Sequence, residues 1–535
     1  MAKDELFQTG DQQGIWQKYC GFLDLSLAEF MEIMEIQEQL LMDQIDLVYD
    51  SPLARKFLPK KPKDESEFRR LVPLTTYEDY APYLGNCQED VLAEKPNYWA
   101  HTSGRGGNFK WAPFARRADE IVCRNMIGAW ILASAKQKGE VNVQPGGRML
   151  FNLPGRPYFS GYLAFSLSQR ISFPIIPPLE EAEGMEFKER IEKGFEIALR
   201  TGVDFLASMS SVLIKIGEDF SERSGNMKFS RSMLHPFILF RLLRALLRCK
   251  LVEKRGLLPK DLWPVKAVFA WGTDTSIYRE QISYYWGKMP YEIYGATESG
   301  VIAMQSWTKK WMTFLADTVF LEFIPEAEWL KSKEDKEYQP TTVLLNEVEE
   351  GKIYEIVVTD FYGMPFLRYR LGDLIKIVAL RDDETGINLP QMVFQARADD
   401  IIDIAGFTRL DEKTVWQAIV NTGIRYEDWA MRKEYEQDKP VLYLYIELKK
   451  NMEAKEVERL IHEQLKAINR DYKDLVSMLE TKPLRVKLLS KGTFQRYLEE
   501  KQRAGVDLAH LKPPHMNASD TLIGELVLLS AKEQV

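Results

Sequence analysis

The chain has 535 residues, of which 45% are hydrophobic and 28% charged, and its formal net charge at pH 7 is −8. This length predicts more than one domain, because a single hydrophobic core stops growing at about 250–300 residues. The acidic balance excludes the basic excess typical of nucleic-acid-binding proteins, so no nucleic-acid partner is expected.

The cysteines and the first residues indicate a cytoplasmic protein. The start, MAKDELFQTG, lacks the apolar core of a secretion signal. No CxxC pair and no HxxxH spacing occur in the sequence, which argues against a dedicated zinc site. The four cysteines are widely separated: Cys20, Cys87, Cys123 and Cys249.

Residues 14–50 alternate apolar and charged residues at helical spacing, which predicts structural helices packed against a larger body. The next informative stretch is HTSGRGGNFKW, residues 101–111. Its glycines allow backbone N–H groups to approach a ligand closely, so this loop is suited to cradle phosphate oxygens. The alternative is a flexible surface loop, with His101 capping it or incidental to it.

From about residue 118 onward, helical patterns such as ADEIVCRNMIGAWILASAKQ alternate with short apolar runs such as GRMLFNL, DFLASM and VKAVFAWG. This rhythm predicts an α/β fold in which helices cover a sheet. Strand-like runs between 340 and 405 predict a β-rich subdomain. Beyond it, mixed helical and strand patterns predict a small α+β unit, and we place the domain boundary between residues 398 and 399.

The stretch HPFILFRLLRALLRCKL, residues 235–251, raises the question of a membrane segment. Its arginines argue against a spanning helix, so no stable membrane insertion is expected. An interfacial helix remains open. We favour a helix whose leucines face the core and whose basic face is solvated. The two predicted faces comprise Arg241, Arg244 and Arg248 on one side and Leu239, Leu242, Leu243 and Leu246 on the other.

Two strand ends are candidates for a ligand site. One carries Thr273 in WGTDT, and the other is YGATE, which ends at Glu298. In α/β sheets, ligands gather beyond the carboxyl ends of strands. Tyr294 could stack on a planar base, and Glu298 could reach a magnesium ion that holds phosphates. The alternative is two ordinary strand ends, with Glu298 capping a helix.

Two later residues extend the pattern. Asp373, at the end of FYGMPFLRYRLGD, could accept both hydrogens of a ribose diol. Arg397, in RADDIIDIAGF, lies next to the predicted domain boundary. Taken singly, Asp373 could instead close a β-turn, and Arg397 could be a surface ion-pair partner.

The order of these motifs resembles that of the acyl-adenylate-forming superfamily. TSGRGGNFK resembles its TSGTTGxPK phosphate loop, YGATE its YGxTE, YRLGD its YRTGD, and RADDIIDIAGF its RxDDxIKxxG hinge segment. More narrowly, VPLTTYEDYAPYL, EEGKIYEIVVTDFYGMPFLRYRLGD and KGTFQRYLEEKQRAGVDLAHLKPPHM resemble the auxin-responsive-promoter (Gretchen Hagen) family of acyl-acid amido synthetases. The phosphate loop and the surroundings of Lys512 depart from the family pattern.

The resemblance implies an α/β fold with a large amino-terminal adenylate-forming domain, residues 1–398, that binds ATP and the acyl group and contains a β-rich subdomain. Residues 399–535 would form a small, mobile α+β carboxy-terminal lid, with the active site between the two. It also implies a ligase that works in two steps. A carboxylate attacks the α-phosphorus of Mg·ATP, and an amine or amino acid then attacks the acyl-adenylate to give an amide and AMP.

The same resemblance assigns roles residue by residue. Lys512 is the lid cation, Glu298 holds Mg²⁺, and Arg105 replaces loop hydroxyls as a grip on the β- and γ-phosphates, its alternative being a solvent-exposed side chain. The remaining nucleotide-binding residues are Thr102, Ser103, Gly104, Gly106 and Gly107 in the loop, Thr273 at the first strand end, Tyr294, Gly295, Ala296 and Thr297 around the base and α-phosphate, and Asp373 and Arg397 at the ribose.

The substrates and the oligomeric state are left open. Arg116, Arg117, Ser208, Ser210 and Ser211 border the region where such enzymes bind the acyl group, but no role is assigned to them. One alternative is an acyl-CoA ligase that resembles phenylacetate-CoA ligases and passes the same adenylate to coenzyme A. Another is a catalytically degenerate protein that senses a nucleotide or an acid.

Overall fold

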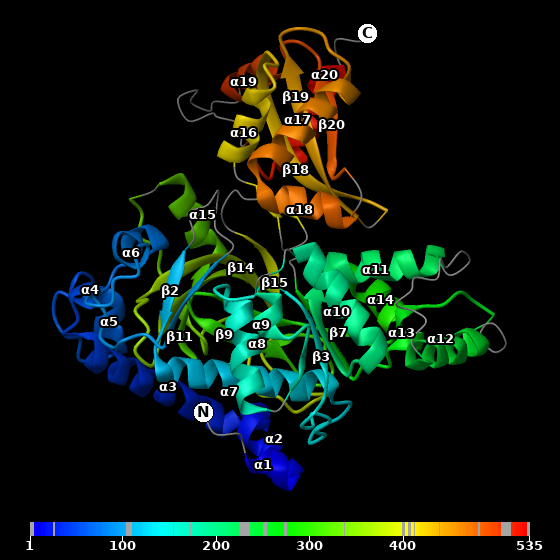
Figure 1. Cartoon of the computed structure of the whole chain (residues 1–535). Coiled ribbons are helices and arrows are strands. Elements are labelled where there is room, and N and C mark those ends of the chain that lie inside the picture. The colour runs from blue at the N-terminus through cyan, green and yellow to red at the C-terminus, as the bar shows by residue number, and fades with distance from the viewer. Residues whose placement is uncertain are drawn as a thin grey trace. The chain divides into compact units, whose positions relative to one another are not determined.

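The computed structural model of the chain forms two compact units, the first built almost entirely from residues 1–398 and the second almost entirely from 399–535 (Figure 1). No helix in the described part of the chain is long and apolar enough to cross a membrane. The structure describes residues 5–24, 27–102, 110–153, 155–171, 173–183, 185, 187–223, 236–249, 254–271, 275–335, 337–397, 402–404, 408–410, 412–437, 439–479, 482–503 and 515–531.

A parallel sheet of five strands, in the order β4-β3-β5-β6-β7, forms one half of the larger unit. Strands β3, β4, β5 and β7 are buried along their length, as expected for a parallel sheet that helices cover. Trp130 of helix α7 (Arg116–Ser134) packs on Phe269 and Phe205, with ring centroids 3.9 and 5.3 Å apart. The strands are β3 (Met149–Asn152), β4 (Ile175–Ile176), β5 (Phe205–Met209), β6 (Ala267–Trp271) and β7 (Pro290–Tyr291).

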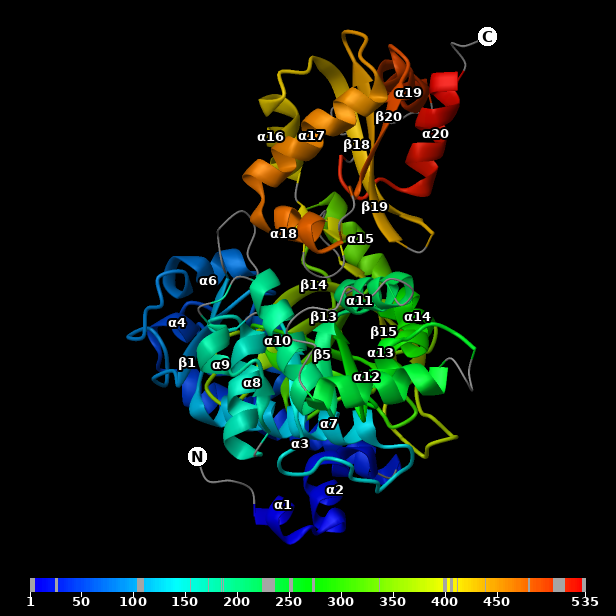
Figure 2. The same cartoon turned by 45° about the vertical axis from the view of Figure 1, so that its right-hand side comes forward.

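Helices follow the strands of this sheet in the predicted rhythm, which confirms the α/β class. Figure 2 shows them gathered around the parallel strands. They are α7 (Arg116–Ser134), α8 (Phe159–Arg170), α9 (Leu179–Ala182), α10 (Phe187–Thr201), α11 (Ser210–Arg223), α12 (Pro236–Arg248), α13 (Pro259–Leu262) and α14 (Thr275–Trp286).

The other half of the larger unit is an antiparallel sheet of eight strands, in the order β12-β11-β13-β14-β15-β10-β9-β8. The β-rich part therefore begins near residue 293, well before the predicted 340. Its strands are β8 (Ile293–Ala296), β9 (Gly300–Gln305), β10 (Met312–Phe314), β11 (Val319–Pro325), β12 (Val343–Leu344), β13 (Ile353–Asp360), β14 (Tyr369–Ala379) and β15 (Gln391–Arg397), and α15 (Glu326–Glu334) follows β11.

The stretch YEIYG belongs to both sheets. Tyr291 ends β7 in the parallel sheet, and two residues later Ile293 begins β8, which pairs antiparallel with β9. The two strand ends singled out from the sequence, WGTDT and YGATE, therefore follow strands of different sheets, which corrects the expectation that both lie at the carboxyl edge of the α/β sheet. An apolar run of five residues could not reveal this change of sheet, because it fits either partner equally well.

The longest amino-terminal helix, α3, packs against the antiparallel sheet. The side-chain amide of Gln37 donates to the carbonyls of Ala316 and Val319 at 2.6 and 2.7 Å, and that of Gln44 donates to Met364 O at 2.7 Å. The predicted structural role of this region is thus confirmed for α3. The helices are α1 (Glu5–Thr9), α2 (Gln12–Cys20), η1 (Gly21–Asp24), α3 (Leu27–Val48), α4 (Pro52–Arg55), α5 (Glu65–Leu71) and α6 (Tyr77–Leu84).

The smaller unit is α+β, as predicted. Strand β19 alternates between two cores: Leu442, Leu444 and Ile446 face one, and Tyr445 lies in the other. Helices therefore cover both faces of the sheet β18-β19-β20. Its elements are β16 (Ile402–Ile404), β17 (Thr408–Leu410), α16 (Glu412–Asn421), β18 (Tyr426–Glu436), β19 (Lys439–Leu448), α17 (Ala454–Ile468), α18 (Arg470–Leu479), β20 (Leu484–Leu489), α19 (Thr493–Arg503) and α20 (Asp520–Ala531).

Helix α12 contradicts the predicted placement of its leucines. Leu242 is buried as expected, but Leu239 and Leu243 are exposed, and Arg241 is half-buried. The Arg241 guanidinium donates to the carbonyl of Ala198 at 3.2 Å at the end of α10. The helix carries more apolar residues than its packing surface covers, so only a narrow stripe of them reaches the core.

Candidate functional site

The glycine-rich stretch is the loop of a β-hairpin. β1 (Tyr98–His101) pairs antiparallel with β2 (Trp111–Phe114), and His101 lies opposite Trp111. At the loop base, Thr102 N donates to Lys110 O at 3.0 Å. The predicted loop residues Ser103, Gly104, Arg105, Gly106 and Gly107 lie outside the described residues, as do Thr273 and Lys512.

His101 closes the base of this hairpin. Its ring Nδ1 lies 2.8 Å from Thr102 O, and the ring packs edge-on against Trp111 and Tyr158. Burial lowers the pKa of His101, which keeps the imidazole neutral near pH 7. These contacts agree with a capping role for His101.

Three side chains from separate motifs meet at the hairpin base. The Tyr369 hydroxyl donates to Glu298 Oε1 at 2.9 Å, and Lys110 Nζ lies 3.5 Å from the same carboxylate oxygen. Lys110 Nζ also donates to the Tyr369 hydroxyl at 3.3 Å. The ammonium lies over the ring of Tyr77, 5.5 Å from its centroid. A cation, a carboxylate and a phenol are thus assembled beside the glycine loop.

A tight turn between β8 and β9 positions Glu298. The turn is closed by a hydrogen bond from Ser299 N to Ala296 O at 3.2 Å. Gly300 has a φ of +75°, which favours glycine, and a Cβ on Gly295 would lie 2.4 Å from Gly300 O. Because an antiparallel strand follows the turn, the alternative in which Glu298 caps a helix is wrong.

The predicted nucleoside residues also come together. The Tyr294 hydroxyl donates to Asp373 Oδ2 at 3.0 Å. Asp373 in β14 lies opposite Arg397 in β15, so the backbones of the two predicted ribose residues are paired. Tyr294 is buried, and Asp373 and Thr297 are half-buried. The structure thus gathers Lys110, Tyr294, Glu298 and Asp373 within the larger unit.

The segment VPLTT fixes the strand that carries Tyr369. Thr75 N donates to Arg368 O, and Arg370 N donates to Thr75 O, both at 2.9 Å. Arg368 has a φ of +43°, an uncommon conformation for a residue with a side chain. Its guanidinium is buried against Glu322 at 2.8 Å. This ion pair holds the turn that presents Tyr369 to Glu298.

Burial shapes the electrostatics of the site. It raises the pKa of Tyr369 well above its ordinary value, and the charge of Glu298 raises it further, so this phenol stays protonated. Burial also raises the pKa of Tyr77 to about 12. Behind the turn, burial raises the pKa of Asp360 well above the ordinary carboxyl range, although the Ser299 hydroxyl opposes the shift.

The residues at the expected acyl-binding region are placed as follows. Arg116 and Arg117 begin α7, and the Arg117 guanidinium lies over the ring of Tyr362, 4.9 Å from its centroid. Ser208 and Ser210 are buried at the end of β5. No role follows from these positions.

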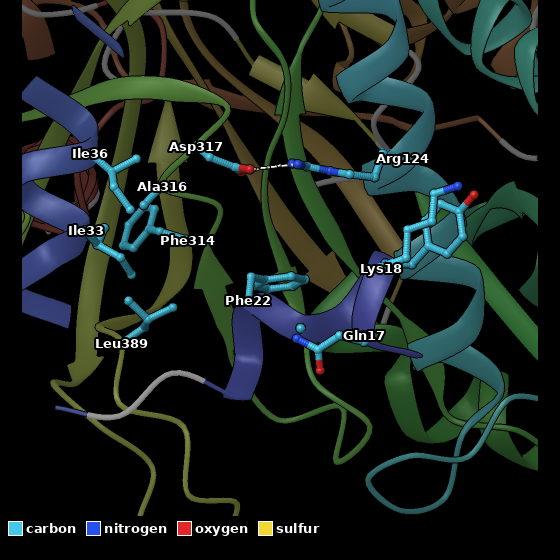
Figure 3. Close-up of a pocket in the computed structure, with 12 residues that line it drawn as sticks. Gln17, Lys18, Phe22, Ile33, Ile36, Arg124, Phe314, Ala316, Asp317 and Leu389 are labelled. Carbon is cyan, nitrogen blue, oxygen red and sulfur yellow. Dashed lines mark hydrogen bonds and ion pairs between the residues drawn. The ribbon is translucent and has the colours of Figure 1, made fainter. Parts of the chain in front are cut away.

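A separate apolar cavity of about 270 Å³ lies against α2, η1 and α3 (Figure 3). Phe22, Ile33 and Phe314 line it, and at its edge Arg124 Nη1 donates to Asp317 Oδ2 at 2.7 Å. None of the predicted site residues lines this cavity. We therefore treat it as distinct from the candidate site.

Sequence reasoning did not single out Lys110, Tyr369 or Asp360. Signals for the first two were present, because Lys110 ends the TSGRGGNFK motif and Tyr369 begins YRLGD. Asp360 carried no such signal. Its position behind Glu298 depends on the turn after β8 and on the end of β13, which are far apart in sequence.

Three family models match the chain. The GH3 family N-terminal domain matches residues 28–153, the GH3 family central domain residues 312–397 and the GH3 family C-terminal domain residues 412–521. These matches cover the hairpin loop, all of β14 and most of the smaller unit.

Curated relatives and solved structures agree with this match. Jasmonoyl–L-amino acid synthetase GH3.5 of Oryza sativa subsp. japonica is 27% identical over 297 residues, which cover 51% of this chain and 49% of the relative. Indole-3-acetic acid-amido synthetase GH3.3 of Arabidopsis thaliana is 25% identical over 269 residues, which cover 47% and 43%. The chain thus spans about half the length of these relatives.

Two solved structures share the fold. The acyl acid amido synthetase AtGH3.15 in complex with 2,4-DB superposes with a TM-score of 0.51 and 17% identity, over 93% of both chains. A 2-hydroxyisobutyryl-CoA ligase in complex with 2-HIB-AMP and CoA has a TM-score of 0.54 and 14% identity, over 91% of this chain and 94% of the ligase. At these identities the likeness concerns the fold alone.

Proposed function

We propose that this chain, which belongs to the GH3 family, is an ATP-dependent acyl acid amido synthetase that joins a carboxylic acid to an amine or amino acid. The observation that carries the proposal is the contact between Lys110, Glu298 and Tyr369. Each residue comes from a different motif. Their convergence supports a site for a nucleoside triphosphate at the base of the hairpin.

The chemistry explains why such a site is needed. A carboxylate does not react with an amine, because hydroxide is a poor leaving group. Attack of the carboxylate on the α-phosphorus of ATP releases pyrophosphate and gives an acyl-adenylate, from which an amine expels AMP. Negative charge develops on the phosphate oxygens during the first step, and fixed cations and donors stabilise it. We assign Lys110 as one such cation.

The nucleoside end of ATP is assigned to the neighbouring residues. We propose that Tyr294 and Thr297 contact adenine and the α-phosphate, with the backbone of Gly295 and Ala296 close to the ring. Asp373 and Arg397 hold the ribose. The hydrogen bond between Tyr294 and Asp373 supports this assignment, because it fixes the ring and the carboxylate relative to one another.

The residues present fit a magnesium ion that arrives with the nucleotide. Glu298 is a buried carboxylate, and no group of three or more His, Cys, Asp or Glu suited to a metal occurs in the described part of the chain. Nucleotide-bound Mg²⁺ is typically held by one or two carboxylates together with phosphates. When bound, the ion would neutralise phosphate charge, and we assign Glu298 to hold it.

Further assignments rest on the family resemblance. Thr102, Ser103, Gly104, Gly106 and Gly107 form the phosphate loop, and Thr273, from WGTDT, joins the nucleotide site. Arg105 grips the outer phosphates. We further propose that residues 1–398 bind ATP and the acyl group, and that residues 399–535 act as a lid that supplies Lys512.

The decisive experiment is ATP–pyrophosphate exchange with a panel of aliphatic, aromatic and indolic carboxylic acids. An amido synthetase incorporates labelled pyrophosphate into ATP only when an acid that it accepts is present. Glu298→Gln is the matched inactive variant, and Glu384→Gln, a change at an exposed surface ion pair, is the control. A wild type that binds ATP but exchanges pyrophosphate with no acid would contradict the proposal and favour a sensor.

The acceptor is tested with the acid that supports exchange. The acid and ATP are incubated with amino acids, simple amines or coenzyme A, and the products are identified by mass spectrometry. Amide formation supports the proposal. A thioester with coenzyme A, in the absence of any amide, would instead assign the chain as an acyl-CoA ligase.

A further inference from the structure

Helix α12 carries two apolar stripes, of which the structure buries only one. Ile238, Leu242 and Ala245 face the core. On the opposite side, Phe240 and Leu243 are 69% and 59% exposed. Figures 1 and 2 both show α12 at the margin of the larger unit. The exposed stripe, which we call the outer face of α12, comprises Leu239, Phe240, Leu243 and Leu247.

The outer face is continuous and has a basic border. At about 100° per residue, its four side chains cover roughly 100° of the helix circumference. Arg244 and Arg248 follow next around the helix, and both are exposed. An apolar stripe beside arginines on a helix surface is the pattern of interfacial helices, which place apolar side chains at the acyl boundary and cations at the headgroups.

The segment that contains α12 is basic, whereas the whole chain is acidic. Residues 223–255 contain nine Lys and Arg and one acidic residue, Glu253, a net charge of +8 in a chain whose formal net charge is −8. The overall charge would repel an anionic surface, whereas this segment would attract it. Such complementarity orients a protein so that the basic segment meets the surface first.

An anionic lipid surface explains the apolar outer face and its basic border better than a second copy of the chain does. In a two-fold symmetric dimer the same patch meets itself, so the outer faces would bring Arg244 and Arg248 close to the partner's arginines. Like charges brought together at a desolvated contact oppose association. A bilayer with anionic headgroups accepts the apolar stripe and pairs with the arginines.

We propose that α12 docks this protein reversibly on the surface of an anionic membrane, with Phe240, Leu243 and Leu247 at the acyl boundary and Arg244 and Arg248 at the headgroups. The helix lies in the plane of the interface and does not span the bilayer. This inference is independent of the proposed ligase activity.

The test is co-sedimentation of the full chain with vesicles of phosphatidylcholine alone and of phosphatidylcholine mixed with phosphatidylglycerol. We expect binding to the anionic vesicles that weakens as the salt concentration rises. Leu243→Asp and the double variant Arg244→Glu/Arg248→Glu should each lower the partition coefficient at least tenfold. All three positions are exposed, so the thermal unfolding midpoint should not change.

Matched controls come from the smaller unit. Leu528→Asp changes a leucine of α20 that is 66% exposed, and Arg459→Glu/Arg470→Glu reverses two exposed arginines. Both controls should bind vesicles like the wild type. Equal loss in the controls would assign the binding to overall charge or exposed apolar area and overturn the role of α12.

Three further results would overturn the proposal. The first is absence of binding to anionic vesicles. The second is equal binding to phosphatidylcholine alone. The third is a concentration-dependent dimer in sedimentation equilibrium that Leu243→Asp abolishes, because the outer face would then belong to an interface between copies of the chain.

Discussion

The Tyr294 hydroxyl donates a 3.0 Å hydrogen bond to Asp373, although their strands β8 and β14 lie four positions apart in the antiparallel sheet. In a flat sheet, four spacings of about 4.8 Å would separate them by roughly 19 Å, more than the two side chains can span. The sheet therefore curls until β8 approaches β14. This curl brings YGATE and YRLGD together.

The first prediction concerns Asp373. Asp373→Ala should weaken ATP binding about ten- to a hundredfold while leaving the fold intact, because one charge-assisted contact to the ribose contributes roughly 1.5–3 kcal/mol. Isothermal titration calorimetry with ATP measures this change. Asp383→Ala, at an exposed aspartate, is the control and should bind ATP like the wild type. An unchanged dissociation constant for Asp373→Ala would exclude the ribose role.

The second prediction concerns Glu298 and its phenol partner. Glu298→Gln should raise the Mg²⁺ concentration that half-saturates pyrophosphate exchange, because the amide would hold the ion less tightly than the carboxylate. It should also lower the maximal rate by about a hundredfold, since the loss of one group that stabilises developing phosphate charge, here the ion, typically costs about 10²–10³ in rate. Tyr369→Phe removes only the hydroxyl that orients the carboxylate at 2.9 Å, so its effect should be smaller. If the two variants lose the same fraction of the maximal rate and neither changes the Mg²⁺ dependence, Glu298 has only a structural role.

The α/β rhythm and the motif order were predictable because each depends on residues near in sequence. Helical periodicity over residues 14–50 predicted α3, and the strand-like runs between 340 and 405 predicted β13 and β14. The change of sheet after Tyr291 was not predictable, since Pro290–Tyr291 and Ile293–Ala296 are equally apolar and differ only in their partners.

The candidate site was predictable only where a residue belonged to a motif. Glu298 and Asp373 were named from sequence, and the structure places both on the curled sheet. Asp360 was missed because its burial depends on contacts between distant segments. The outer face of α12 was misassigned because periodicity shows that a helix has apolar stripes but not how many of them a neighbour covers.

The third prediction concerns the pH dependence of stability. The pKa of the buried Asp360 is raised, so the native state keeps a proton that the unfolded chain releases near its ordinary pKa of about 4. Stability therefore falls as pH rises from about 4 toward the native pKa. Asp360→Asn keeps the shape without the charge. It should raise the unfolding free energy at neutral pH, because folding of the variant requires no proton uptake and buries no charge at this position.

The increase in unfolding free energy caused by Asp360→Asn should shrink as the pH is lowered toward about 4.5. At that pH the unfolded wild-type chain also binds the proton readily, so the wild type no longer has to take it up on folding. Urea unfolding of both proteins at several pH values measures this. If the variant is destabilised by the same amount at every pH, the carboxylate is not the source of the pH dependence.

The fourth prediction concerns the buried pair of Arg368 and Glu322. Glu322→Ala should destabilise the larger unit by about 3–5 kcal/mol, because it leaves the Arg368 guanidinium buried without its carboxylate. Thermal unfolding measures the effect. Glu384→Ala removes one partner of the exposed pair with Lys310 and should leave the midpoint unchanged. Equal midpoints for both variants would show that Glu322 does not hold the Arg368 turn.

The last prediction concerns Arg105, where the loop departs most from the family pattern. The family loop offers hydroxyls at the two positions that Arg105 and Gly106 occupy, and a guanidinium with five N–H donors can replace both. Arg105→Ala should therefore raise the apparent constants for ATP and pyrophosphate by about tenfold or more, whereas AMP affinity should barely change, since AMP lacks the outer phosphates. Arg105→Thr restores a hydroxyl and should recover part of the loss. Equal ATP affinity in the wild type and Arg105→Ala would place the guanidinium in solvent and leave phosphate binding to the backbone of the loop and to Lys110.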